Sequence, residues 1–168
     1  MNQPANPLPA NSQVRIGHVH LKVADLERAI GFYRDVLGFQ LTQRIGRGAA
    51  FLSAGGYHHH IGLNTWESGG GPPPPHATGL YHLAILYPTR AELADALRRV
   101  LDAELPLSGA ADHGVSEAIY LRDPDGNGVE LYRDKPQDQW PHTADGELAM
   151  VTQPLDWEAL LKEAKPRH

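Results

Sequence analysis

The sequence predicts an α+β fold in which two paired βαβββ modules form a curved mixed sheet around a cleft. The first observation is a repeated opening. A histidine starts an apolar strand and a capping residue seven positions later starts a helix, at His18 with Asp25 and again at His82 with Thr89. The second observation is that three short runs typical of strands follow each helix. Two such modules would place their sheets side by side around the cleft.

The first module is expected over residues 14–66. Apolar and polar residues alternate over 14–24, with a phase slip near Gly17 that a β-bulge would explain. Asp25 is a typical N-cap, apolar residues at helical spacing follow it, and Gly38 is a typical helix stop. Three short strands are then predicted, at 39–45, 48–53 and 58–65.

A linker separates the modules at residues 67–78, ESGGGPPPPHAT, because its glycines bend the chain and its prolines stiffen it. The second module is expected over 79–134, and Thr89 with Glu92 forms a capping box at the start of its helix. Its predicted elements are a strand at 80–87, the helix to about 103, and strands at 105–108, 115–122 and 127–133.

Outside the modules we expect a flexible leader at 1–13 and a turn-rich tail at 135–168 with a short helix at 155–164. The leader lacks the basic and apolar regions of a signal peptide, so a cytoplasmic location is expected. No apolar run approaches the roughly 20 residues of a transmembrane helix, so no membrane contact is expected.

The composition excludes several chemistries. The 168 residues include no cysteine, which excludes disulfides, thiolate zinc sites and a cysteine nucleophile. The formal net charge is −5 and there is no block of like charge, which argues against a nucleic-acid surface. Any metal site must therefore use nitrogen and oxygen ligands.

Three residues on separate predicted strands are candidate metal ligands: His18, His82 and Glu130. Strand alternation places His18 and His20 on one face of the first strand and the apolar residues on the other. Glu130 likewise points away from its apolar neighbours. The apolar residues of the first strand are Val19, Leu21 and Val23. Two histidines and one carboxylate form a facial triad with open coordination positions. This ligand set predicts a metal cleft of the Fe(II) type.

The chain resembles the vicinal-oxygen-chelate superfamily of glyoxalase, bleomycin resistance and extradiol dioxygenase proteins. The resemblance rests on the segments IGHVHLKVADLERAIGFYRDVLGF, AGGYHHHIGLNTW, GLYHLAIL and AIYLRDPDGNGVELY. It covers nearly all of residues 14–133 and is nearest to the catechol 2,3-dioxygenase-like members. It implies paired βαβββ modules and a divalent metal held by His18, His82 and Glu130.

The resemblance also implies roles in proton handling. Tyr120 matches an active-site tyrosine that hydrogen-bonds the substrate oxygen in extradiol dioxygenases. His59, with His60 beside it, matches the family's histidine for proton transfer, a role that suits a side chain titrating near neutral pH. Strand parity would place His58 and His60 on one face and His59 on the other, which leaves open which of them acts. His113 is a weaker match to another pocket histidine, because it lies closer to Tyr120 than in the family.

Gly62 argues against one related reaction. It corresponds in the repeat to Glu130, where the similar glyoxalase I enzymes carry a fourth ligand, and glycine cannot ligate. The expected function is therefore ring cleavage of a catechol-like diol by an Fe(II)-dependent extradiol-type dioxygenase, as in aromatic degradation. Mn(II) or another divalent metal would also suit these ligands.

Two classes of alternative stay open. One is another metalloenzyme of the same family, either glyoxalase-like or a thiol transferase of the fosfomycin-resistance type, which would need a basic pocket. The other is a non-catalytic small-molecule-binding module, although such members usually lack the triad. The expected partners are an aromatic diol and O₂. Many related dioxygenases have four modules and this chain has two, so a homodimer is also expected.

Overall fold

The structure is a computed structural model that describes residues 10–71, 73–74 and 76–166. It confirms the predicted α+β class, with its strands in two open mixed sheets and not in one continuous sheet. None of the helices in these ranges is long and apolar enough to cross a membrane. Parts of three predicted segments lie outside the described residues: 1–9 of the leader, 72 and 75 of the linker, and 167–168 of the tail.

The first module contains strand β1 (Val19–Lys22), helix α1 (Leu26–Gly31), and strands β2 (Gln40–Ile45), β3 (Ala49–Ser53) and β4 (Ile61–Asn64). Asp25 caps α1 by accepting the N–H of Arg28, as predicted, and a π-helical turn at Phe32–Val36 extends the helix. The strands predicted at 14–24 and 58–65 are both longer than β1 and β4. Residues 58–60 bend, so β4 begins only at Ile61, which pairs with Val19, and the chain before Val19 has no strand to pair with.

The second module repeats this order with strand β5 (Leu83–Leu86), helix α2 (Arg90–Asp102), and strands β6 (Leu107–Asp112), β7 (Ser116–Arg122) and β8 (Gly128–Asp134). Thr89 caps α2 by accepting the N–H of Glu92, and its hydroxyl donates to the Glu92 carboxylate. The capping residue and the helix therefore lie where the sequence predicts them.

The two modules have the same strand order and equivalent strand pairing. The first sheet has the order β1-β4-β3-β2, and the second has β5-β8-β7-β6 before an added strand. In both, the strand that begins directly after the histidine runs parallel to the last strand of the module: Val19 pairs with Ile61, and Leu83 pairs with Val129. One residue further on, Gly62 and Glu130 occupy equivalent positions, as the sequence repeat predicts.

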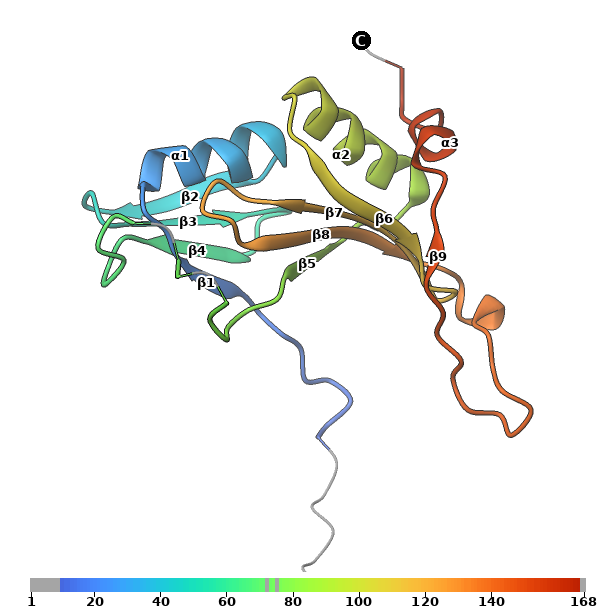
Figure 1. The fold of residues 1–168 in the computed structure, drawn as a ribbon. Helices are drawn as coiled ribbons and strands as arrows, with labels where there is room; N and C mark the ends of the chain where they lie inside the picture. Colours follow the sequence, from blue (N-terminus) through green and yellow to red (C-terminus); the bar gives the residue numbers. More distant parts are fainter. Residues whose placement is uncertain (1–9, 72, 75, 167–168) are drawn as a thin grey trace, which may run out of the picture.

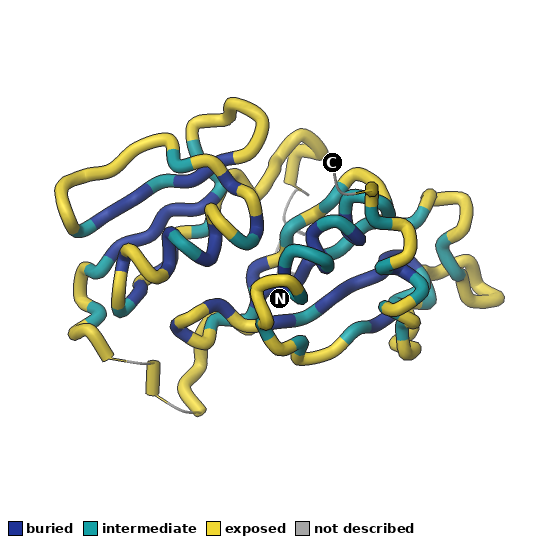
Figure 2. The backbone as a smooth tube through the Cα atoms, turned by 90° about the horizontal axis from the view of Figure 1, so that it is seen from above, coloured by how far each residue is buried: buried dark blue, intermediate teal, exposed yellow. Residues whose placement is uncertain are grey.

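The modules pack side by side with α1 and α2 on the same side of the two sheets (Figure 1). Buried residues of both helices and both sheets form one core. Figure 2 shows buried stretches of the backbone in both modules. Polar contacts also join them: the buried Tyr33 hydroxyl donates to Asp123 at 2.9 Å, and Arg28 pairs with Asp125 at 2.7 Å. Arg99 of α2 donates to the carbonyl of Val36 at 3.0 Å.

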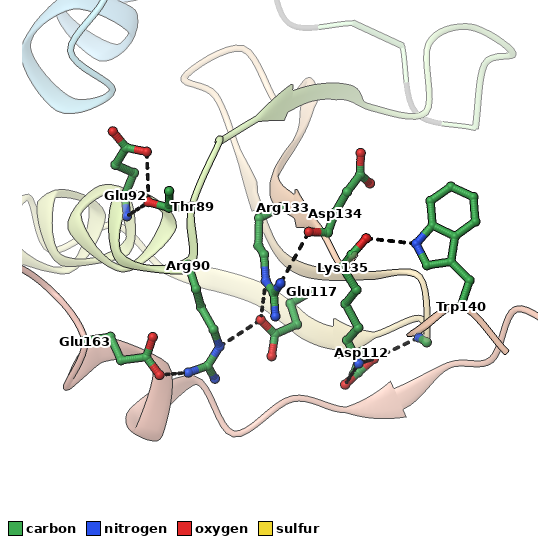
Figure 3. A network of polar contacts seen from close by, with 11 residues as sticks. Thr89, Arg90, Glu92, Asp112, Glu117, Arg133, Asp134, Lys135, Trp140 and Glu163 are labelled. Atoms are coloured by element: carbon green, nitrogen blue, oxygen red, sulfur yellow. Dashed lines mark hydrogen bonds and ion pairs between the residues drawn. The ribbon is translucent and has the colours of Figure 1, made fainter. Parts of the chain in front are cut away.

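The tail packs against the second module. It includes a 3₁₀ turn (Gln137–Gln139), strand β9 (Gln153–Pro154) and helix α3 (Trp157–Leu161), which lies within the helix predicted at 155–164. β9 pairs with β6 and adds a fifth strand that the sequence did not predict. Figure 3 shows polar contacts that hold this region: Glu117 accepts from Arg90 and from Arg133, each at 2.8 Å, and Arg90 also pairs with Glu163 of the tail.

Candidate active site

His82 and Glu130 form a close pair in the second module. His82 lies directly before β5, and Glu130 lies in the adjacent strand β8, where it pairs with Ala84. Nε2 of His82 is 2.9 Å from Oε2 of Glu130. Two ligand atoms at right angles, each about 2.1 Å from a metal, would be about 3 Å apart, so this pair fits two neighbouring coordination positions. Nδ1 of His82 is buried, with no hydrogen-bond partner among the described residues.

Tyr120 lies directly opposite Glu130 on the neighbouring strand β7. Its hydroxyl donates to Oε1 of Glu130 at 3.0 Å, and Nε2 of His113 lies 2.7 Å from the same hydroxyl oxygen. Burial, followed by the Glu130 carboxylate, raises the pKa of Tyr120, so the phenol keeps its proton at neutral pH. The structure thus brings Tyr120, Glu130 and His82 together.

His113 links this group to the tail. Its Nδ1 lies 3.0 Å from the carbonyl oxygen of Val151 and 3.3 Å from the hydroxyl of Thr152. A carbonyl oxygen only accepts, so its contact with His113 requires a proton on Nδ1. Through its two ring nitrogens His113 thus connects the Tyr120 hydroxyl to the backbone and hydroxyl of the tail. Sequence patterns point only weakly to His113 and do not point to Val151 or Thr152.

A cavity of about 340 Å³ opens beside these residues. Its walls include His82, Tyr120, His113, Tyr81, Arg122 and Thr152. This volume lies at the lower end of the range for small-molecule sites, and its walls combine aromatic surface with a few converging polar groups. Because Thr152 belongs to the tail, the tail contributes directly to the shape of the cavity.

The histidines of the first module gather in a second cluster. The rings of His18 and His59 are 4.5 Å apart between centroids, and Nδ1 of His58 is 2.8 Å from Nδ1 of His59. Burial and the neighbouring imidazoles lower the pKa of His59. His60 instead turns to Ser53, with 3.1 Å between Nδ1 and Oγ. Strand parity does not apply to these three residues, because they precede β4.

His20 occupies the space next to Gly62. The two residues pair across β1 and β4, and a Cβ atom added to Gly62 would lie 2.9 Å from Cγ of His20. Nε2 of His20 also lies 2.9 Å from Nδ2 of Asn64. A side chain at the position equivalent to Glu130 would therefore collide with His20, and the first module has no carboxylate there.

The described part of one chain does not assemble a complete metal site. Over residues 10–71, 73–74 and 76–166, no group of three or more histidine and carboxylate side chains is arranged to hold a metal ion. His82 and Glu130 converge in the second module, whereas His18 lies in the first module against His59. Within a single chain the residues thus fit two ligand positions and not the third.

The sequence model of the Glyoxalase/Bleomycin resistance protein/Dioxygenase superfamily matches residues 15–131. The chain belongs to this superfamily. It is 42% identical over 154 residues to a catechol-2,3-dioxygenase from Bacillus subtilis, which covers 92% of the chain and 53% of that protein. It is 35% identical over 121 residues to biphenyl-2,3-diol 1,2-dioxygenase 3 from Rhodococcus globerulus, covering 71% of the chain and 63% of that protein. The chain thus spans between half and two thirds of the length of these relatives.

Glyoxalase-type relatives match as well. A lactoylglutathione lyase from Escherichia coli O157:H7 is 26% identical over 127 residues and is covered over 94% of its length. Among solved structures, a glyoxalase/dioxygenase from Nostoc punctiforme superposes with a TM-score of 0.63 at 20% identity, over 79% of this chain and 100% of the other. A lactoylglutathione lyase from Agrobacterium tumefaciens gives a TM-score of 0.58 at 24% identity, over 73% and 96%. These structures support the fold alone.

Proposed function

We propose that this protein is a metal-dependent, extradiol-type ring-cleaving dioxygenase that acts on a catechol-like diol with O₂. The observation that supports it best is the placement of Tyr120 between Glu130 and His113 in the wall of the cavity. The similarity to two diol dioxygenases favours this reaction over others in the superfamily. Fe(II) is the metal that we propose, with Mn(II) as a substitute.

The residues of this chain would hold and move protons around the substrate. Tyr120 stays protonated at neutral pH, so its hydroxyl, which donates to Glu130 in the structure, can turn its proton to an oxygen of a diol in the cavity. His113 lies 2.7 Å from that hydroxyl and can return a proton to Tyr120 during turnover. A divalent metal, when bound, would supply the positive charge that favours a deprotonated diol.

A glyoxalase-like reaction is the second candidate, because lactoylglutathione lyases also match the chain over most of their length. Gly62 and His20 argue against it. The register aligns Gly62 with Glu130, and the His20 ring fills the space that a fourth ligand would need. We therefore rank ring cleavage first.

The test is O₂ consumption by protein loaded anaerobically with Fe(II) and supplied with simple catechols. We expect one O₂ to be consumed for each diol lost, and we expect Glu130→Gln to lose this reaction. Glu158→Gln, on the exposed face of α3, is the matched control and should keep it. Loaded protein that consumes no O₂ with any simple catechol, but catalyses the glyoxalase I reaction, would favour the second candidate.

A further inference from the structure

We infer that the C-terminal tail positions His113 for its role beside Tyr120. Val151 and Thr152 are the positioning residues. They hold the imidazole so that its protonated Nδ1 faces the tail and its Nε2 faces the Tyr120 hydroxyl. The part of this inference that concerns turnover rests on the proposed function. It adds which residues orient the histidine and which of its two ring nitrogens exchanges a proton.

The first argument is that the tail continues the second sheet up to His113. β9 pairs Gln153 with Asp112, and one step closer to the turn the N–H of Val151 donates to the carbonyl of His113 at 3.1 Å. The N–H of His113 in turn donates to the carbonyl of Ser116 at 2.8 Å. The backbone of His113 is therefore held from two sides, by β7 on one side and by the tail on the other.

The second argument is that both ring nitrogens of His113 have partners at hydrogen-bond distance. Nδ1 lies 3.0 Å from the carbonyl oxygen of Val151 and 3.3 Å from the hydroxyl of Thr152, and Nε2 lies 2.7 Å from the hydroxyl of Tyr120. In a neutral imidazole one nitrogen donates and the other accepts, and the partner of one nitrogen decides which. Because the Val151 carbonyl can only accept, the proton belongs on Nδ1, and Nε2 presents its lone pair to Tyr120.

The third argument is that this orientation gives the Tyr120 proton a second acceptor. Oε1 of Glu130 lies 3.0 Å from the Tyr120 hydroxyl, and Nε2 of His113 lies 2.7 Å from it. The hydroxyl can therefore turn its proton from the carboxylate to the imidazole without any movement of the backbone. A His113 ring turned over about its Cβ–Cγ bond would present a carbon atom to Tyr120 and would lose its bond to the tail. The tail contacts thus favour the one orientation in which His113 can exchange a proton with Tyr120.

The tail is also fixed by contacts outside the cavity. Lys135, at the start of the tail, forms an ion pair with Asp112 at 2.6 Å (Figure 3). Gly114, directly after His113, has a φ of +78°, and a Cβ added there would lie 2.8 Å from Cγ of Pro141. The turn that carries His113 therefore packs so closely against the tail that it leaves no room for a side chain.

The first test reads the tautomer of His113 from the nitrogen NMR shifts of its ring, at mildly alkaline pH, where an ordinary imidazole is neutral. We expect wild-type protein to carry the proton on Nδ1. In Gly114→Ala the added Cβ should push the tail away, so the proton should divide between the two nitrogens. A wild-type ring with its proton on Nε2, or a folded Gly114→Ala variant with the wild-type tautomer, would overturn the inference.

Two further variants separate the effect of the tail from the strain of a side chain at positive φ. Gly146→Ala is the matched control, because Gly146 has a φ of +83° and a Cβ there meets no atom within 4 Å. It should keep the wild-type tautomer. Pro141→Ala added to Gly114→Ala removes the atoms nearest the new Cβ, so the tail can return and the tautomer should revert. A double variant that does not revert would show that the turn, and not the tail, orients the ring.

The second test uses Thr152, where a substitution can remove one hydroxyl and little else. Thr152→Val keeps the size of the side chain. It should lower kcat for catechol cleavage by about 5-fold, the effect of losing one hydrogen bond, with little change in KM. Thr152→Ser restores the hydroxyl and should keep the wild-type kcat. Equal kcat for Thr152→Val and wild type would overturn the role of Thr152.

These measurements let the two proposals fail separately. The tautomer is read without metal or substrate, so it decides how the tail acts on His113 even if Fe(II)-loaded protein consumes no O₂ with any catechol. That absence of O₂ uptake would overturn the dioxygenase function alone. An active enzyme whose His113 tautomer is the same in wild type and Gly114→Ala would overturn the inference about the tail alone.

Discussion

Tyr120 and Glu130 lie directly opposite each other on β7 and β8, with the phenol donating to the carboxylate at 3.0 Å. The pairing of β7 with β8 places the two side chains next to each other. The hydrogen bond therefore connects a proposed proton donor to a proposed metal ligand. A change at either residue should therefore affect chemistry more than folding.

Tyr120→Phe should lower kcat for catechol cleavage by about 100-fold and change KM little, because it removes a positioned proton donor and keeps the ring. Steady-state O₂ uptake with the Fe(II)-loaded protein measures both constants. Tyr87→Phe is the matched control, because Tyr87 is not among the residues that line the cavity. Equal kcat for Tyr120→Phe and wild type would remove Tyr120 from the proposed chemistry.

Gly62→Ala should destabilise the fold by about 1 to 3 kcal/mol, because its Cβ would overlap with the His20 ring. Gly109→Ala is the matched control, since a Cβ in that strand meets no atom within 4 Å. Urea denaturation of both variants measures the difference. The loss should shrink when His20→Ala is added to Gly62→Ala. An unchanged loss in the double variant would mean that the ring is not the obstacle.

Tyr33→Phe should lower the free energy of unfolding by about 1 kcal/mol, because it removes a buried hydrogen bond between the modules. Asp123 still accepts from Asn127, so its carboxylate is not left without partners. Tyr57→Phe, on an exposed loop, should change stability little. Chemical denaturation followed by tryptophan fluorescence provides the comparison, and two variants of equal stability would argue against this contact between the modules.

The Asp112–Lys135 ion pair should make the fold sensitive to acid. Burial alone would raise the pKa of Asp112, but Lys135 at 2.6 Å and the N–H of Gly114 overcome it and hold the pKa below its usual value. A lowered pKa in the folded state contributes stability above the unfolded pKa of about 3.9, and that stability is lost as pH falls through the lower folded pKa.

Asp112→Asn should therefore destabilise the protein by about 1 kcal/mol at pH 7 and make its stability fall less steeply below about pH 4. Urea midpoints measured across this pH range give the slopes. Asp145→Asn, in the exposed turn before Gly146, serves as the control. Identical slopes for Asp112→Asn and wild type would show that this pair does not carry the acid sensitivity.

Local signals predicted much of the fold. Asp25 and Thr89 cap helices where expected, and the repeat correctly aligned Gly62 with Glu130, because both depend on short-range spacing along the chain. The strand ends were less accurate. β1 and β4 are short because the bend at 58–60 limits their pairing, and alternation in one segment cannot reveal where its partner strand begins.

Long-range packing could not be predicted from the sequence. The contact between Tyr33 and Asp123 joins residues 90 positions apart, and it helps to fix how the two modules pack against each other. The contact of His113 with Val151 depends on where the tail packs, and the turn-rich sequence of the tail does not indicate that position. The pairing of Tyr120 with Glu130 was accessible, because both lie on adjacent strands joined by a short turn.

The most direct test of the proposed function is mass spectrometry of the product formed from catechol under isotopically labelled O₂. Fe(II)-loaded protein should give a ring-opened product with one labelled oxygen in its new carboxylate and, until it exchanges with water, one in its new aldehyde. The reason is that extradiol cleavage breaks the ring bond beside the diol and adds one atom of O₂ to each of the two carbons. A product with no label in the carboxylate, or with the aromatic ring intact, would contradict extradiol ring cleavage by this protein.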